Sequence, residues 1–172
     1  MKRKMLVIVA MIAMIFSLSV VNAKEVEVND AATLLAAFKN AESGDVVKLI
    51  DNITYTLPDR VLVSTDVTLN MNNHNIDFDG ASVRSFTVQD GSLNIIGKGT
   101  ISHPEHNALN VRGTTDKTKV NYSTLKVGKD VTVNGLYGIA VFYDPENKKI
   151  GYGVNVEFAG KIESTEGGIT TV

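Results

Sequence analysis

Residues 86–102 read FTVQDGSLNIIGKGTIS, and this stretch contains three short segments with strand character. Valine, isoleucine, leucine and threonine dominate the segments 86–88, 92–97 and 99–102, and these residue types favour extended backbone. Aspartate and glycine stand at the breaks between segments, where they favour turns. We therefore interpret the stretch as one unit of three strands joined by tight turns.

The same unit recurs along the rest of the chain. Its first strand begins near residues 86, 109, 139 and 169, so successive units are 23, 30 and 30 residues apart. The two longer steps contain polar inserts at 113–121 and 144–149. A solenoid tolerates such inserts because each coil contacts only its neighbours. The pattern predicts an all-β fold, a right-handed parallel β-helix (solenoid) with coils about 4.8 Å apart. It also places four aliphatic residues in one inward row: Leu69, Leu93, Leu125 and Val156.

A single segment before these strands has the pattern of a helix. Apolar side chains recur at helical spacing in residues 31–41, and Asp30 is a suitable N-cap. Gly44, within 43–45, is suited to a left-handed cap that ends the helix. We expect this N-terminal amphipathic helix to lie across the open end of the solenoid as a cap, because exposed strand edges invite aggregation. A helix packed on an antiparallel sandwich stays an alternative, since Asn134-Gly135 is a hairpin signal.

Residues 1–23 have the organisation of a secretory signal peptide. Three basic residues precede the apolar run 5–16, and Val21 and Ala23 stand at positions −3 and −1 of a cleavage site. An uncleaved membrane anchor is the competing interpretation, although the apolar stretch is short for a span. We divide the chain into a signal peptide (1–23), an N-terminal strand and capping helix (24–45), and β-helix coils (46–172) that stop at the start of a further coil.

The composition excludes several classes of protein. The chain has no cysteine, which excludes a disulfide framework, a thiolate metal site and a cysteine nucleophile. Its net charge of −2 provides no electrostatic attraction for nucleic acid. An exported domain without disulfides fits a bacterial protein better than a eukaryotic one. We therefore expect a secreted or cell-surface bacterial protein, with no membrane insertion once the signal peptide is cleaved.

Two stretches near the N-terminus carry a resemblance to a known group. GDVVKLIDNIT at 44–54 and VTLNMNNHNID at 67–77 resemble the opening coils of pectate-lyase-like β-helix proteins, which are often described as adhesin-like surface proteins. The resemblance covers residues 26–102 and departs from the usual pattern at Asn73, where glycine is common. It implies a parallel β-helix at the cell surface. Because architecture defines this group, the resemblance implies no active-site residues.

Candidate site residues are few. Tyr143 and Tyr152 flank the insert 144–149 and are our candidates for a ligand-facing aromatic platform, and Arg112 is a candidate glycan or carboxylate contact. We predict no catalytic residue, no metal site and no cofactor. Four aspartates could form an acidic ridge for a hard cation, although solvated turn residues are the simpler interpretation: Asp66, Asp77, Asp79 and Asp90.

Two further sets of polar residues have structural interpretations. The segment His103-Pro104-Glu105-His106 lacks the spacing of a helical metal site, so we expect a solvated loop at the corner of a coil. Asparagines gather near the turns, where stacked side chains can form hydrogen-bonded ladders along a solenoid.

These observations lead to two functional hypotheses. The first is an exported, non-catalytic, adhesin-like β-helix segment with a structural or glycan-binding role, whose partner is a carbohydrate or a host or cell-surface ligand. The second is the N-terminal part of a polysaccharide lyase or glycoside hydrolase. The uncapped C-terminal coil also predicts end-to-end self-association.

Overall fold

The structure is a computed structural model that describes residues 23–79, 85–113, 122–142 and 153–171. In this part of the chain, fourteen strands and one helix follow each other from Glu25 to Thr171. In chain order the elements are β1 (Glu25–Val28), α1 (Ala31–Lys39), β2 (Val46–Leu49), β3 (Ile53–Thr54), β4 (Val61–Val63), β5 (Asp66–Asn70), β6 (Ile76–Asp77), β7 (Phe86–Gln89), β8 (Ser92–Ile96), β9 (Gly99–His103), β10 (Leu109–Arg112), β11 (Ser123–Val127), β12 (Val131–Phe142), β13 (Val154–Phe158) and β14 (Lys161–Thr171).

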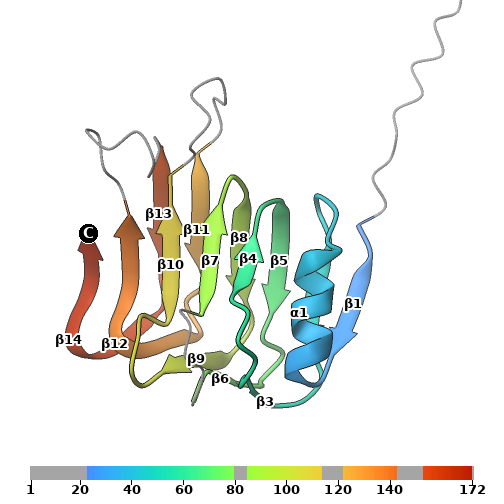
Figure 1. The fold of residues 1–172 in the computed structure, drawn as a ribbon, viewed down its shortest axis with the longest axis horizontal. Coiled ribbons are helices and arrows are strands. Elements are labelled where there is room, and N and C mark those ends of the chain that lie inside the picture. The colour runs from blue at the N-terminus through green and yellow to red at the C-terminus, as the bar shows by residue number, and fades with distance from the viewer. Residues whose placement is uncertain (1–22, 80–84, 114–121, 143–152, 172) are drawn as a thin grey trace, which may run out of the picture.

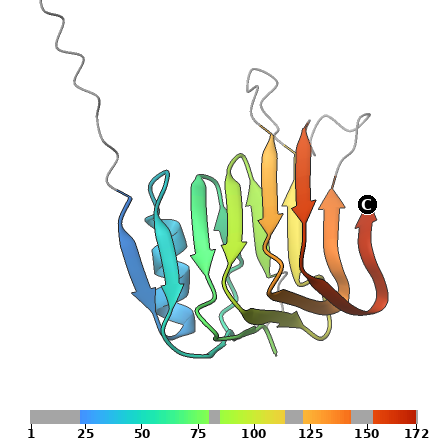
Figure 2. The ribbon, with the colours of Figure 1, turned by 180° about the vertical axis from the view of Figure 1, so that it is seen from behind.

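The strands wind into a parallel β-solenoid. In Figure 1, β4, β7 and β10 rise on the near side, and β5, β8 and β11 descend behind them, as the opposite view in Figure 2 shows. Because the chain advances from α1 towards its C-terminus while winding in this sense, the solenoid is right-handed. The predicted fold is confirmed.

Two hydrogen-bonded sheets of the described residues form three faces of the solenoid. The first face is the sheet β1-β2-β5-β8-β11-β13. The other sheet bends around two faces: β3, β6 and β9 form the second face, and β4, β7 and β10 form the third. The long strands β12 and β14 each run through the second and the third face. β12 pairs with β9 over its first residues and with β10 over its last, and β14 pairs with β12 over both parts. The sequence predicts that a new strand begins near residue 139, but β12 runs without a break from Val131 to Phe142, because one bent strand turns the corner between the two faces.

The rows of inward side chains follow the repeat closely on the third face. The predicted starting positions of successive units pair in register from Phe86 to Leu109, Ile139 and Ile169. On the first face, Leu93, Leu125 and Val156 share a row as predicted.

The placement of Leu69 in that first-face row is wrong. Leu69 pairs with Ile95, and Val67 takes the position opposite Leu93. A shift of two residues keeps the same side chains facing inward, so the alternation of apolar residues cannot distinguish the two registers.

Helix α1 closes the N-terminal end of the core. Asp30 is its N-cap, as predicted: the Thr33 N–H donates to Asp30 Oδ1 at 2.7 Å. The predicted C-terminal cap is wrong, because the helix ends at Lys39 with Asn40 as C-cap. Gly44 adopts a positive φ of 95° in the turn beyond the helix.

The buried face of α1 packs into the apolar core. The ring of Phe38 on this face contacts the ring of Phe86 edge to face, with ring centroids 5.4 Å apart. The helix stands upright in the row of β4, β7 and β10 (Figure 1), so it takes the place of a third-face strand in the first coil. This position places α1 against β4, the strand at the N-terminal end of the third face.

Aromatic side chains fill one corner of the core. Phe78 is fully buried and contacts both Tyr55 and Phe86, with ring centroids 4.8 Å and 5.6 Å away. The imidazole of His103 stacks on Phe78 and is only 1% exposed. The expectation of a solvated corner is therefore wrong for His103, because the side chain at the end of β9 points into the core and not into the loop that follows.

The antiparallel sandwich is also excluded by the strand pairing. All the recorded strand pairs between described residues are parallel, and Asn134 and Gly135 lie inside β12 and not in a hairpin turn. No helix among the described residues is long and apolar enough to cross a membrane.

Candidate functional site

A row of polar side chains crosses the outer surface of the first face. Asp66 pairs with Ser92, Ser92 with Thr124, and Thr124 with Asn155 in the strand register. Inward and outward side chains alternate along a strand, so these four residues project from β5, β8, β11 and β13 on the side opposite the buried row. Adjacent strands are about 4.8 Å apart, and the row therefore repeats one hydrogen-bonding side chain at that spacing along the solenoid axis. We call it the polar row: Asp66, Ser92, Thr124 and Asn155.

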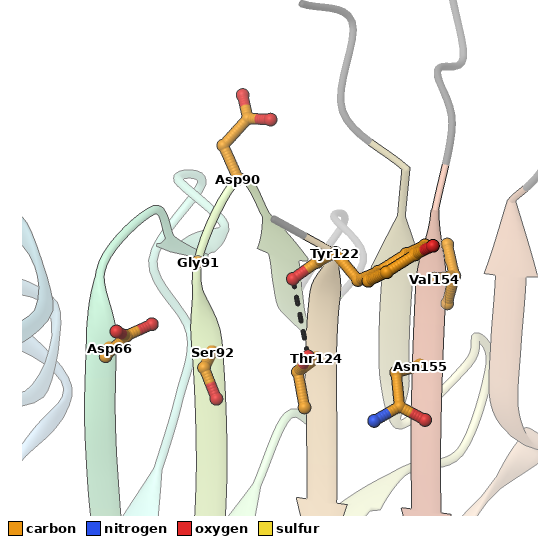
Figure 3. A pocket seen from close by; sticks show the side chains of 8 residues that line it. All are labelled: Asp66, Asp90, Gly91, Ser92, Tyr122, Thr124, Val154 and Asn155. Atoms are coloured by element: carbon orange, nitrogen blue, oxygen red, sulfur yellow. Dashed lines mark hydrogen bonds between the residues drawn. The ribbon is translucent and has the colours of Figure 1, made fainter. Parts of the chain in front are cut away.

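The polar row forms the floor of a groove of about 620 Å³. Figure 3 shows Asp66, Ser92, Thr124 and Asn155 side by side on their strands, with Asp90 above them. Asp90 has a φ of 64°, and Gly91 follows it in the turn between β7 and β8. A Cβ at Gly91 would lie 2.6 Å from the backbone of Ser64, so only glycine allows the turns of two coils to stack this closely.

Tyr122 and Val154 form the C-terminal wall of the groove (Figure 3). Tyr122 is 62% exposed. A Cβ atom at Gly153 would collide with the Tyr122 ring. Gly153 itself has a φ of 75°. The absence of a side chain at Gly153 thus lets an aromatic ring lie against the backbone at the rim of the groove. Thr124 donates from Oγ1 to the carbonyl oxygen of Tyr122 at 3.3 Å, which links the rim to the floor.

Charged side chains beside the polar row compensate each other. Lys126 Nζ lies 3.0 Å from Glu157 Oε1, and Asn155 Nδ2 donates to the same oxygen at 3.1 Å. These hydrogen bonds lower the pKa of Glu157. At the N-terminal end of the face, Lys48 Nζ donates hydrogen bonds to the carboxylates of Glu25 and Glu27. These hydrogen bonds raise the pKa of Lys48. Lys126 and Lys48, which flank the row, are therefore both paired with glutamates.

A second groove of about 430 Å³ lies on the second face. Asp77 and Asp79 line it together with Ser102, whose hydroxyl donates to Asp77 Oδ1 at 3.0 Å. Asp66 and Asp90 line the first groove instead. The acidic ridge of four aspartates is therefore wrong, because the solenoid places the two pairs on different faces. Among the described residues, no three histidine, aspartate or glutamate side chains gather in a way that could hold a metal ion.

Of the candidate residues chosen from the sequence, the structure describes Arg112, which lines neither of these two grooves. Arg112 is on the third face, where its guanidinium carbon lies 4.9 Å from the ring centroid of Phe142 on the neighbouring strand. It therefore makes a cation–π contact within the chain. Tyr143 and Tyr152 lie outside the described residues.

Sequence reasoning overlooked Tyr122 as a groove residue. Its signal was available in the repeat: Tyr122 immediately precedes β11 in the coil that follows the Asp90-Gly91 turn. The asparagine ladder, by contrast, exists in part. The Asn75 N–H donates to Asn52 Oδ1, and the Thr100 N–H donates to Asn75 Oδ1, both at 2.8 Å.

Comparison of the chain with protein-family models, with curated proteins and with solved structures finds no match. The assignment of a function therefore depends on the geometry of the groove and on the chemistry of its side chains.

Proposed function

We propose that this chain is an exported, non-catalytic, adhesin-like β-solenoid of the bacterial cell surface, and that it binds an extended carbohydrate along the polar row. The observation that carries the proposal is the register of Asp66, Ser92, Thr124 and Asn155 across four adjacent strands. A regular series of donors and acceptors suits a ligand that itself repeats hydroxyl groups along an extended chain.

Two features of the groove support a carbohydrate as the ligand. The exposed ring of Tyr122 at the rim offers an apolar surface with a polar hydroxyl, a combination that suits the mixed surface of a sugar. The compensated charges of Lys126 and Glu157 beside the row favour a neutral or weakly charged glycan over a polyanion.

Binding of polysaccharides to the purified chain tests this proposal. A panel of neutral and acidic glycans is screened by affinity electrophoresis, and the dissociation constant of any hit is measured by calorimetry. Thr124→Val removes one hydroxyl of the row without changing the side-chain volume, and we expect about fivefold weaker binding. Thr132→Val makes the same change on the second face and serves as the matched control.

Three variants, Thr124→Val, Tyr122→Ala and the control Thr132→Val, separate binding in the groove from other effects. Unchanged binding by Thr124→Val and by Tyr122→Ala, or an equal loss with Thr132→Val, would show that the polar row is not the site. If no glycan binds to the chain, the carbohydrate proposal is rejected.

The second candidate function is that of an N-terminal part of a polysaccharide-cleaving enzyme. The observation in its favour is that two carboxylates, those of Asp66 and Asp90, line the same groove. Incubation of the chain with each glycan, with and without calcium, followed by analysis of chain length, distinguishes the hypotheses. Cleavage that is lost in Asp66→Asn would support the enzyme and overturn the non-catalytic proposal.

Export is tested separately, by expressing the full sequence in a bacterium and sequencing the N-terminus of the product. Cleavage after Ala23 yields an extracellular chain that begins at Lys24. A product that keeps residues 1–23 in the membrane fraction would favour the uncleaved anchor.

A further inference from the structure

Asp45 is a buried carboxylate beside Lys24, the first residue after the predicted signal peptide. It is 2% exposed, and its oxygens accept two backbone N–H groups. The Glu42 N–H donates to Asp45 Oδ2 at 3.0 Å, and the Lys24 N–H donates to Asp45 Oδ1 at 3.1 Å. These hydrogen bonds lower the pKa of Asp45, so the carboxylate is charged at neutral pH. A buried charge is costly unless a charge of opposite sign pairs with it.

The ion pair that Asp45 makes in the intact chain is weak. Lys24 Nζ lies 3.8 Å from Asp45 Oδ2, and the Lys24 side chain is 56% exposed. Water screens the charge of such a lysine, and holding its long side chain in place costs entropy, so the pair contributes little. Among the described residues no other ion pair of Asp45 is recorded. The Oδ1 atom of this carboxylate therefore faces a neutral donor, the backbone N–H of Lys24.

The backbone of Lys24 is held beside Asp45 by the strand ladder. The Val46 N–H donates to the Lys24 carbonyl oxygen at 2.9 Å, and β1 continues the parallel pairing with β2 from Glu25 onwards. The position of the Lys24 nitrogen is thus fixed by backbone hydrogen bonds and does not depend on its own side chain. This nitrogen is also the atom that the predicted cleavage after Ala23 releases.

Cleavage changes the charge of that nitrogen. A signal peptidase hydrolyses the Ala23–Lys24 peptide bond with one water molecule: Ala23 gains a carboxylate, and the Lys24 nitrogen becomes an α-amino group, which is largely protonated at neutral pH. The neutral amide donor to Asp45 is replaced by an ammonium donor at the same atom. Hydrogen bonds between charged groups are roughly twice as strong as those between neutral groups. Lys24 is exposed, so the remaining ammonium protons can bond to water.

We propose that removal of the signal peptide completes the fold by forming an ion pair between the new α-ammonium group of Lys24 and the buried carboxylate of Asp45. This inference rests on the proposed export of the chain, and it adds a structural reason for cleavage between Ala23 and Lys24. A chain that begins at Ala23 carries its ammonium group one residue away from Asp45, and a chain that begins at Glu25 lacks the nitrogen altogether. The mature solenoid is therefore more stable than the solenoid with residues 1–23 attached.

A thermodynamic cycle on the mature chain tests the ion pair. Chains that begin at Lys24 or at Ala23 are released from an N-terminal fusion by a protease that leaves no extra residue, and each is also made with Asp45→Asn. Urea unfolding gives the equilibrium constant between folded and unfolded chain. With Asp45 present, we expect this constant to favour folding about tenfold more for the Lys24 start than for the Ala23 start. With Asp45→Asn the two starts should be equal.

The side-chain amine of Lys24 is removed by Lys24→Gln in both starts as the matched control. The tenfold difference should persist in this background, because the α-ammonium group produces it. Equal stability of the two starts with Asp45 present, or the same difference with Asp45→Asn, would overturn the proposal.

Reactivity of the α-amino group gives a second measurement that does not require Asp45→Asn to fold. An aldehyde reagent selective for α-amines attacks only the neutral amine. In the chain that begins at Lys24, we expect the folded state to react at least about tenfold more slowly than the chain unfolded in urea, since the carboxylate favours the ammonium form. The chain that begins at Ala23 should react at similar rates in both states. Equal rates in both states for the Lys24 start would also refute the ion pair.

N-terminal sequencing of the exported product separates this inference from the proposed function. A product that begins at Lys24, without the stabilisation or the slowed reaction, refutes the ion pair and leaves export intact. A secreted product that begins at another residue also refutes the ion pair, because the ammonium group is then elsewhere. A product that keeps residues 1–23 refutes both the ion pair and the proposed cleavage.

Discussion

Two adjacent isoleucines on β8, Ile95 and Ile96, provide a direct test of which side chains of the strand face the core. Ile95 is fully buried in the row between Leu69 and Val127, whereas Ile96 is 39% exposed and pairs with Asn70 on the outer surface. Ile95→Ala and Ile96→Ala remove the same atoms from neighbouring positions of one strand. Differences in intrinsic strand propensity therefore cancel between the two variants.

The expected magnitudes follow from burial. Truncation of a fully buried isoleucine to alanine costs about 2–5 kcal/mol of unfolding free energy, because the transfer free energy is lost and a cavity remains between the coils. Ile96 is partly solvated and leaves no enclosed cavity, so its truncation should cost about 1 kcal/mol or less. We expect Ile95→Ala to be less stable than Ile96→Ala by at least about 1 kcal/mol.

Urea unfolding followed by far-ultraviolet circular dichroism measures this difference, since the chain has no tryptophan to report by fluorescence. With an m-value of about 2 kcal/mol/M, a difference of at least about 1 kcal/mol moves the midpoint by at least about 0.5 M. Equal midpoints for the two variants, or a lower midpoint for Ile96→Ala, would refute the alternation of inward and outward side chains along β8.

Three further predictions concern a turn and two titratable groups. Gly91→Ala should lower stability by about 1–3 kcal/mol in the same assay, because a Cβ there would overlap the backbone of the preceding coil; an unchanged midpoint contradicts this. Burial raises the pKa of Tyr55 to about 12, so the stability that the neutral phenol contributes at neutral pH should fall between pH 10 and about 12, and Tyr55→Phe should remove that part of an alkaline titration. Backbone N–H groups of Glu42 and Lys24 donate hydrogen bonds to the Asp45 carboxylate and lower its pKa. The stability that ionised Asp45 contributes should therefore be present above the ordinary aspartate pKa and be lost as the pH falls through the lowered pKa of the folded state. If Asp45→Asn leaves the midpoint of acid unfolding unchanged, this prediction is wrong.

Much of the fold was predictable because a solenoid is specified locally. The three-strand unit at 86–102, its recurrence at 109 and 139, and the N-cap at Asp30 follow from residue types and spacing within one coil. The register of Leu69 was not predictable in this way, because a shift of two residues preserves the inward pattern. The continuity of β12 around a corner was missed for a related reason: the glycines at its bend resemble a turn in the sequence.

The candidate site was much less predictable. Tyr122 and Asn155 come from different coils and share a groove only because the coils stack in register. Arg112 was chosen as an isolated cation next to a turn, but the ring of Phe142, thirty residues later, lies under its guanidinium.

The sequence by itself determined the unit of this protein: strand, turn, strand, turn, strand, preceded by a capped helix. These are local choices of backbone conformation, made by neighbouring residues. The tertiary structure alone decided which outward side chains meet. Asp66, Ser92, Thr124 and Asn155 are far apart along the chain, and parallel stacking brings them into one row. It also decided where the helix packs, since Phe38 of α1 meets Phe86, a residue far along the chain, only once the coils have stacked.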